Sequence, residues 1–480
     1  MPEKMQGSGR RSAPAVHSNE TPLSSGSRDG RFPSMKVVVI GVGQVGRSVA
    51  HALAEEHEVI AVDKDPDRLE KIRAETDVLT YEGNGAKLEV LKTAEIQDAD
   101  LVIGSTSDDR SNILICSTAR ALNKDAFTIA RVAETEYLAT WSQLQEAFNV
   151  DYMVGADHLT ARNIVEVVGL PTARNVERFG QGRVVMAEFT IPEKSPVAEK
   201  TVQALQLSGG VNLVAVFDDE HMELVRGTTR LQPGTRLLVI GQPSQVEQFA
   251  GTLTPKSRVR QARQIMILGG GEIGYQTARM LEQRGLQPRL VEKDPDRAQA
   301  LAQELPDTLV LQNDATDPKF LRREGVADTD LVVSALTPDE RNLLTSVLSL
   351  DLGAKQVLSV VHRDVYESVF TRSGIDTTVN PRREVIEEIL RHTRVRGIEK
   401  ITFVERDRGE VVEVELTAEN SIVGRPIKEA AEAMPHNFVL GAVIRDGEVL
   451  IPRGKTVLEP QDHLVMFVET DVSAEVLEAL

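Results

Sequence analysis

The chain has 480 residues, of which 41% are hydrophobic and 27% are charged, and its formal net charge at pH 7 is -18. This length exceeds one ordinary hydrophobic core, so we expect several globular domains. The acidic balance argues against nucleic acid or anionic lipid as a partner, because both require a clustered positive surface. No apolar run approaches the roughly 18–20 residues of a membrane-spanning helix, so we expect no direct membrane insertion.

The N-terminal segment 1–34 is rich in Ser, Gly, Pro and Arg and lacks the continuous apolar region of a secretory signal. We expect this extension to be disordered, and Met35 is a candidate functional start.

The single cysteine, Cys116, excludes an internal disulfide and a cysteine-based metal cluster. Because it lies in an apolar helical pattern, a buried structural thiol is the favoured interpretation.

Residues 35–175 alternate short runs rich in Val and Ile with amphipathic helical segments. We expect strands near 36–40, 58–62, 78–81, 100–104, 126–130 and 150–154, each followed by a helix. Such alternation is typical of an α/β domain with a doubly wound parallel sheet, because parallel strands need crossover connections.

A glycine motif follows the first expected strand and begins the first expected helix. In a Rossmann-like domain, Gly41 would permit the tight turn, Gly43 would let a pyrophosphate approach the backbone, and Gly46 would allow close packing. The helix N-terminus then offers free N–H groups to phosphate. Asp63 ends the second expected strand, where a carboxylate accepts hydrogen bonds from ribose hydroxyls and repels a 2′-phosphate. The motif therefore favours NAD or another adenosine ligand over NADP.

The end of the fourth expected strand, Gly104-Ser105-Thr106, should lie across the crevice in which such sheets hold ligands. The following residues Asp108, Asp109 and Asn112 are explained as well by capping of the next helix as by ligand contact. Arg131 ends the fifth strand, where it would either meet phosphate or form a surface ion pair. These alternatives stay open from the sequence.

A small α+β domain is expected at 176–257, with strands near 184–191, 212–219 and 236–240 and a short helix near 199–205. The polar and basic segment 254–263 that follows is expected to be a solvated linker.

The two-domain unit is repeated. QIMILGGGEIG at 264–274 repeats KVVVIGVGQVG at 36–46, and RGKTVLEPQDHLVMF at 453–467 repeats RGTTRLQPGTRLLVI at 226–240. We therefore expect a second Rossmann-like domain at 264–395 and a second small domain at 396–480. The second copy of the motif consists of Gly269, Gly271, Gly274 and Glu292.

Corresponding positions in the second copy are less polar. Ser334-Ala335-Leu336 corresponds to the strand end at Thr106, and Asp339 and Asn342 correspond to the polar residues that follow it. Arg363 or His362 is expected to correspond to Arg131. The first crevice therefore looks more competent for binding than the second.

Catalytic patterns are missing from the sequence. None of the five tyrosines has a lysine four positions later, as alcohol dehydrogenation by a Tyr-Lys couple would need. RGKT at 453–456 lacks the first glycine of a P-loop, since position 449 is Val449, and the nine histidines show no metal-ligand spacing. A regulatory protein is favoured over the alternatives, a tandem NAD-dependent oxidoreductase and a soluble nucleotide sensor for another partner.

The domain order, together with MKVVVIGVGQVG, VDKDPDRL, EGNGAKLEVLKTAEIQDADLVIGSTSDDRSN and the repeated VEKDPDR, resembles the TrkA family over residues 35–480. These proteins are regulatory subunits of Trk potassium uptake systems and are built from tandem RCK modules. The resemblance implies that the Rossmann-like domains bind NAD or NADH, or in some members ATP or ADP. The binding residues carried over are Gly41, Gly43, Gln44, Val45, Gly46, Asp63, Asn84, Thr106, Asp108 and Arg131, and in the second copy Gly269, Gly271, Glu272, Ile273, Gly274, Glu292 and Asp314.

Two departures from the family pattern bear on these sites. Ala133 stands where a second arginine is frequent, which weakens the case for a triphosphate contact. Asn313 stands where glycine is usual, which implies an altered or weaker second site. The resemblance further implies a cytoplasmic homotetramer at the inner face of the plasma membrane, bound to an integral-membrane potassium transporter subunit of the TrkH or TrkG type.

Overall fold

The computed structural model describes residues 34–480 except 55–56, 169, 171–172, 206, 208, 219–220, 254–263, 376, 393–397, 405–407, 433, 435–436, 473–474 and 477–478. The disorder expected for the N-terminal extension and the linker expected at 254–263 both lie outside the described residues.

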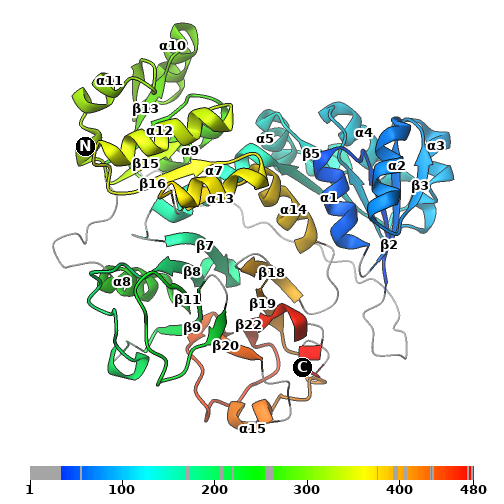
Figure 1. Ribbon diagram of the computed structural model, residues 1–480. Helices are drawn as coiled ribbons and strands as arrows, with labels where there is room; N and C mark the ends of the chain where they lie inside the picture. The colour runs from blue at the N-terminus through cyan, green and yellow to red at the C-terminus, as the bar shows by residue number, and fades with distance from the viewer. Residues whose placement is uncertain are drawn as a thin grey trace, which may run out of the picture.

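The first half forms a six-stranded parallel sheet with the order β3-β2-β1-β4-β5-β6 (Figure 1). Its strands are β1 (Lys36–Ile40), β2 (Glu58–Asp63), β3 (Leu79–Glu82), β4 (Leu101–Gly104), β5 (Phe127–Val132) and β6 (Tyr152–Gly155). Its helices are α1 (Gln44–Leu53), α2 (Pro66–Glu75), α3 (Leu88–Thr93), α4 (Asp109–Leu122), α5 (Thr135–Gln143), α6 (Gln145–Phe148) and α7 (Ala156–Val168). The strand order reverses between β1 and β4, so a ligand crevice is expected at the carboxyl ends of these two strands.

The second half repeats this arrangement in the order β14-β13-β12-β15-β16-β17. Its strands are β12 (Ile265–Leu268), β13 (Arg289–Glu292), β14 (Leu309–Gln312), β15 (Leu331–Ser334), β16 (Val357–Val360) and β17 (Thr377–Val379). Its helices are α9 (Glu272–Gln283), α10 (Pro295–Glu304), α11 (Pro318–Arg323), α12 (Asp339–Asp351), α13 (Asp364–Arg372) and α14 (Pro381–Arg391). The predicted fold class, two doubly wound domains that each precede a small α+β domain, is confirmed.

The repeated DPDR segment shows how local sequence sets these boundaries. The side chain of Asp65 accepts a hydrogen bond from the N–H of Asp67, and Pro66 occupies the first turn of α2. Asp294 caps α10 in the same way through the N–H of Arg297. A capping carboxylate followed by proline satisfies the helix start and prevents the preceding strand from continuing.

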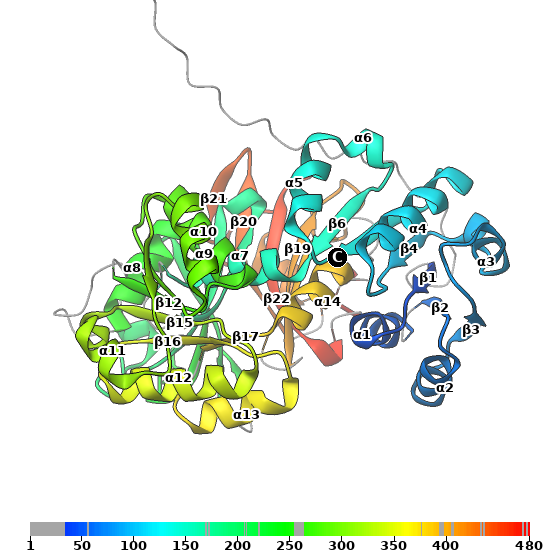
Figure 2. The ribbon, with the colours of Figure 1, turned by 90° about the horizontal axis from the view of Figure 1, so that it is seen from above.

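Each half contributes its last Rossmann helix to the core of the other half. Ile164 of α7 is fully buried in the same core as Ile265 and Leu281 of the second half. Val385 and Ile389 of α14 are fully buried among residues of the first sheet. Viewed from above, α14 lies beside α1, and α7 lies beside α9 (Figure 2). The two Rossmann domains are therefore interlocked by exchanged helices, which the sequence assigned to their own domains.

The small domains each contain a five-stranded antiparallel sheet, in the orders β10-β9-β11-β8-β7 and β18-β19-β22-β20-β21. The first consists of β7 (Ala173–Phe179), β8 (Val184–Thr190), β9 (Val211–Phe217), β10 (Met222–Leu224) and β11 (Arg236–Gly241), with helix α8 (Pro243–Leu253). The second consists of β18 (Ile398–Val404), β19 (Gly409–Glu415), β20 (Phe438–Arg445), β21 (Glu448–Leu450) and β22 (His463–Glu469), with helix α15 (Ile427–Glu432). The expected short helix near 199–205 is a 3₁₀ turn at Val202–Leu205.

The two small sheets pack against each other below the Rossmann domains in the view of Figure 1. Their shared core contains Met186 and Ile240 from the first sheet and Val465 from the second. Phe217 and Phe467 meet edge to face with ring centroids 6.2 Å apart. The small domains thus share a core without exchanging any of the described strands between their sheets. None of the described helices combines the length and apolarity that crossing a bilayer requires.

Candidate functional site

The first glycine motif forms a tight backbone cradle between β1 and α1. Gly41 has φ +93°, and a Cβ there would lie 2.6 Å from the backbone nitrogen of Thr106. A Cβ on Gly46 would lie 2.0 Å from the carbonyl oxygen of Gly41. Gly43 differs, because the nearest described atom to its hypothetical Cβ is Nη1 of Arg68, 3.8 Å away. Sterics of the fold therefore require Gly41 and Gly46, whereas Gly43 leaves space at the start of α1, where N–H groups are free to bind phosphate.

Asp63 joins this cradle to the end of β2. Its side chain is buried, with 6% exposure. Its Oδ2 accepts a hydrogen bond from the N–H of Val42 at 2.9 Å, and its Oδ1 accepts one from the N–H of Asp65 at 3.0 Å. Each carboxylate oxygen has two acceptor positions, so capacity for ribose hydroxyls remains. Asp63 therefore holds the loop in place, and Nη1 of Arg68 lies 3.5 Å from its Oδ2.

The far side of this crevice is organised by Asn112, which is fully buried. Its Oδ1 accepts from the N–H of Thr106 at 2.8 Å, and its Nδ2 donates to the carbonyl of Arg131 at 2.7 Å. The guanidinium of Arg131 turns toward the same strand end, with Nη1 donating to the carbonyl of Thr106 at 3.4 Å. Its Nε is buried and has no hydrogen-bond partner among the described residues. The structure thus brings Thr106 and Arg131 together and leaves a buried donor at the crevice.

Two of the expected binding residues act locally in the structure. Asp108 caps α4, because its Oδ2 accepts from the N–H of Ser111 at 2.9 Å and from its hydroxyl at 2.5 Å. These hydrogen bonds lower the pKa of Asp108. Asn84 closes a turn by accepting from the N–H of Ala86 at 2.9 Å. Val45 packs on the core of the first sheet, so its backbone N–H is the part available to a phosphate.

The second glycine motif reproduces the backbone cradle. Gly269 has φ +112°, and a Cβ on Gly274 would lie 2.0 Å from the carbonyl oxygen of Gly269. A Cβ on Gly271 would meet no described atom within 4 Å. Glu292 accepts from the N–H of Gly270 at 2.9 Å through Oε2, and from the N–H of Asp294 at 2.7 Å through Oε1. Ile273 is buried in the core, and its counterpart Val45 is partly buried.

The far side of the second crevice has apolar side chains where the first crevice has Thr106 and Arg131. Asn342 makes the same bridge as Asn112, accepting from the N–H of Leu336 at 2.6 Å and donating to the carbonyl of Val360 at 2.9 Å. Val360 therefore occupies the place of Arg131, and the expected equivalence of Arg363 or His362 is wrong. The repeat spacing shortens before β16, which the sequence match did not reveal.

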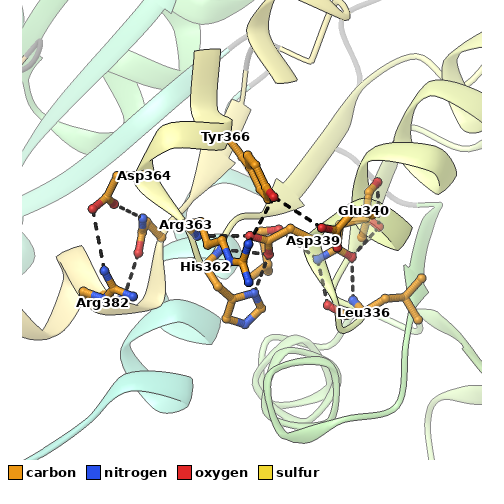
Figure 3. A network of polar contacts seen from close by, with 12 residues as sticks. Leu336, Asp339, Glu340, His362, Arg363, Asp364, Tyr366 and Arg382 are labelled. Carbon is orange, nitrogen blue, oxygen red and sulfur yellow. Dashed lines mark hydrogen bonds and ion pairs between the residues drawn. The ribbon is translucent and has the colours of Figure 1, made fainter. Parts of the chain in front are cut away.

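His362 and Arg363 instead stand where the first half has Ala133 and Glu134. Their N–H groups bond to Asp339 at 3.0 and 3.1 Å, as those of Ala133 and Glu134 bond to Asp109. Figure 3 shows the side chain of His362 on Asp339, with an Nδ1–Oδ1 distance of 2.7 Å. The guanidinium of Arg363 turns away toward the hydroxyl of Tyr366 at 3.1 Å.

Asp314, the counterpart of Asn84, lies in an ion-pair network. Lys293 donates to its Oδ2 at 2.7 Å, the N–H of Thr316 donates to Oδ1 at 3.0 Å, and Arg341 approaches Oδ1 at 3.3 Å. The hydrogen bonds from Lys293 and Thr316 hold the pKa of Asp314 well below its usual range. Lys293 and Arg341 are thereby engaged by a carboxylate of the protein.

The first turns of α1 and α9 contact the opposite half. The side chain of Gln44 accepts from Nη2 of Arg382 at 2.7 Å, and Oε1 of Glu272 accepts from the hydroxyl of Thr135 at 2.5 Å. The sequence singled out Gln44 and Glu272 but neither partner. Both contacts join the two halves, and the local sequence pattern carries no signal for either of them.

We define crevice 1 as the loop 41–46 with Asp63, Thr106 and Arg131, and crevice 2 as the loop 269–274 with Glu292, Leu336 and Val360. Both cradles combine a tight glycine loop with a carboxylate that accepts hydrogen bonds from backbone N–H groups. Crevice 1 adds a polar far side to this cradle, and crevice 2 adds an apolar one.

Comparison with known proteins gives consistent matches over the chain. The model of the TrkA-N domain matches residues 37–156 and 265–381, and that of the TrkA-C domain matches 186–253 and 411–480. The Trk system potassium uptake protein TrkA homolog 1 of Methanosarcina mazei is 32% identical over 449 residues, covering 92% of this chain and 99% of that protein. The TrkA protein of Vibrio alginolyticus is 28% identical, covering 93% of this chain and 98% of that protein.

Solved structures share the fold. The GsuK RCK domain superposes with a TM-score of 0.57 at 17% identity, covering 94% of this chain and 96% of that chain. The GsuK channel bound to NAD has a TM-score of 0.58 at 17% identity, covering 96% of this chain and 81% of that chain. At this level of identity, the likeness concerns the architecture of tandem Rossmann-like and small domains.

Proposed function

The chain belongs to the TrkA family, and from this membership we propose that it is a regulatory subunit that gates a Trk-type potassium uptake membrane protein when nucleotide binds in crevice 1. The relatives that support the proposal are named as Trk system potassium uptake proteins and match more than nine-tenths of this chain. We propose domain limits of 35–175, 176–257, 264–395 and 396–480.

One observation carries the nucleotide assignment. The cradle at Gly43 is open while the flanking glycines are packed, and it is flanked by the buried carboxylate of Asp63 and the buried Nε of Arg131. An adenosine ligand would place its ribose hydroxyls on Asp63, its pyrophosphate on the N-terminus of α1, and negative charge toward Arg131. NAD or NADH is the first ligand to test, since the similarly folded GsuK channel has been solved with NAD, and ATP and ADP are the next.

The exchanged helices supply a route from ligand to partner. A nucleotide in crevice 1 would contact α1, which packs against α14 of the other half, so its binding would bias how the two halves are arranged. A ligand that binds two arrangements unequally shifts their populations, and a typical coupling of about 1–3 kcal/mol changes activity by about 5- to 150-fold. We propose that a homotetramer at the cytoplasmic face transmits this bias to a subunit of the TrkH or TrkG type.

Copurification tests the proposal. The full chain, expressed with a candidate potassium-translocating membrane subunit, should form a detergent-stable complex whose potassium flux responds to nucleotide. Absence of any complex, together with turnover of NADH on a small substrate, would show that the chain is an oxidoreductase instead and would overturn the proposal.

A further inference from the structure

The two crevices also differ at their distal ends, which we define as the region beyond the ends of β5 and β16, away from Asp63 and Glu292. At the distal end of crevice 1, Glu272 enters from the second half. Its Oε1 accepts from the hydroxyl of Thr135 at 2.5 Å and from Nε2 of Gln276 at 2.7 Å. Thr135 begins α5 directly after β5, which carries Arg131. The carboxylate of one half therefore lies at the start of α5 in the other half, just after the strand that carries Arg131.

A second carboxylate lies at the same end. Asp157 is the second residue of α7 and follows β6, in which Val154 pairs with Arg131. Burial and the charge of Glu272 raise the pKa of Asp157, while His362 and Arg131 oppose that shift. Two acids thus share the distal end of crevice 1 with one guanidinium, and ionising both already has a cost in free energy.

The equivalent positions in crevice 2 hold a glutamine and an arginine in place of the two acids. Gln44 follows the second glycine of its motif as Glu272 does, and Arg382 is the second residue of α14 as Asp157 is of α7. Nη2 of Arg382 donates to Gln44 at 2.7 Å, and Nη1 lies 3.9 Å from a carboxylate oxygen of Asp364. Figure 3 shows Arg382 beside Asp364 at this end of crevice 2.

Resting on the proposed nucleotide site, we propose that Glu272 and Asp157 determine ligand selectivity in crevice 1 by rejecting the terminal phosphate of a nucleoside triphosphate. If a ligand has its ribose on Asp63 and its diphosphate at the start of α1, the group attached to the diphosphate extends toward the distal end of crevice 1. In ATP this group is a further phosphate that would face both carboxylates, and juxtaposed like charges are strongly unfavourable. In a dinucleotide it is a second nucleoside, which is uncharged or carries a cationic ring. Crevice 1 accordingly selects a dinucleotide such as NAD⁺ over ATP.

Calorimetric titration of the full chain tests this selectivity. Gly271→Val is introduced first, because a Cβ at Gly271 would meet no described atom within 4 Å, which leaves room for the added side chain at the expected pyrophosphate position of crevice 2. With EDTA present, so that no divalent cation masks the phosphates, NAD⁺ and ADP should bind at least about tenfold more tightly than ATP. Glu272→Gln keeps the acceptor for Thr135 and should tighten ATP about tenfold while changing NAD⁺ less than about threefold. Asp157→Asn should act in the same direction.

Glu282→Gln is the matched control, because it neutralises an acid at the far end of the same helix and should leave the ratio of ATP to NAD⁺ affinity unchanged. If nucleotides bind but neither Glu272→Gln nor the double variant with Asp157→Asn alters that ratio, the selectivity proposal is wrong and the nucleotide site stands. If none of the nucleotides binds to the unmodified chain, the proposed function fails and the selectivity proposal fails with it.

Discussion

Crevice 1 and crevice 2 share a backbone and differ in side chains. Both glycine loops use a positive φ at the first glycine and have no room for a Cβ at the third, because the loop must pass under the neighbouring strand end. Asn112 and Asn342 bridge the same backbone groups in both halves, and these bonds need nothing from the side chains at Thr106 or Leu336. The fold therefore preserves the cradle in both halves. The far side differs, because the hydroxyl of Thr106 donates to Asn112 and Arg131 donates to the carbonyl of Thr106, whereas crevice 2 has Leu336 and Val360 at these places.

Blocking one glycine loop at a time should change nucleotide affinity more than any other substitution in the two crevices. Gly43→Val fits the protein, because Gly43 has φ -64° and its Cβ position is open, yet the side chain would occupy the place of the pyrophosphate. We expect nucleotide affinity of crevice 1 to fall by at least about 100-fold. Gly271→Val should change total binding much less. Equal losses for the two variants, measured by calorimetry, would remove the distinction between the crevices.

Removing a buried contact of an exchanged helix tests the interlocking of the halves. Ile389 of α14 is fully buried in the first core, so Ile389→Ala should cost about 2–5 kcal/mol of stability. Amide hydrogen exchange should rise in β1 and α1 rather than in β12 and α9. Ile164→Ala, its counterpart on α7, should show the reverse pattern. Exchange confined to the half that carries the substitution would contradict the observed packing.

Replacing Arg131 of crevice 1 by valine, the residue at the corresponding position of crevice 2, tests how much this one side chain contributes to nucleotide binding. Arg131→Val should weaken nucleotide binding by about 10- to 100-fold, because hydrogen bonds from a charged donor contribute about 1.5–3 kcal/mol. Val360 already fills the corresponding place in crevice 2, so the variant should fold normally. The reciprocal Val360→Arg serves as a control for crevice 2. Unchanged affinity in Arg131→Val would show that this guanidinium faces no phosphate.

A smaller effect is expected from pH. Burial lowers the pKa of His158 from 6.5, and nearby Arg162 and Arg279 add to the effect while Glu388 opposes it. The folded protein therefore favours neutral His158, so its contribution to stability is complete above pH 6.5 and is lost as the pH falls through the lowered value. Urea unfolding should show a smaller acid-induced loss of stability for His158→Gln than for the unmodified chain. Identical pH profiles would refute this assignment.

The sequence predicted the strands and the glycine loops, because hydrophobic periodicity and glycine spacing determine them. All six strands of the first sheet overlap their expected positions, and Asp63 and Glu292, the acids expected to bind ribose, lie at the ends of β2 and β13. Two strands of the first small domain, β7 and β10, were not expected, since neither is a long apolar run. An amphipathic helix reveals only that one face is buried, so the exchange of α7 and α14 could not be predicted. Contacts that depend on it, such as Gln44 with Arg382, were inaccessible for the same reason.

Misalignment of Arg131 had a different cause. The sequence pairs Arg131 with Arg363 or His362, because these cations stand near the ends of the similar segments IARV and SVVHR. The hydrogen bonds from Asn112 and Asn342 identify Val360 as the structural equivalent instead. A residue's neighbours across the strands, rather than its charge, determine its register.

Potassium flux through a reconstituted complex tests the account most directly. Vesicles would contain the transporter subunit with the unmodified chain, Gly43→Val or Gly271→Val, and flux would be measured with and without NAD⁺. We predict that nucleotide changes flux by about 5- to 150-fold for the unmodified chain and for Gly271→Val, and not at all for Gly43→Val. A full nucleotide response in Gly43→Val would contradict the claim that crevice 1 is the sensor.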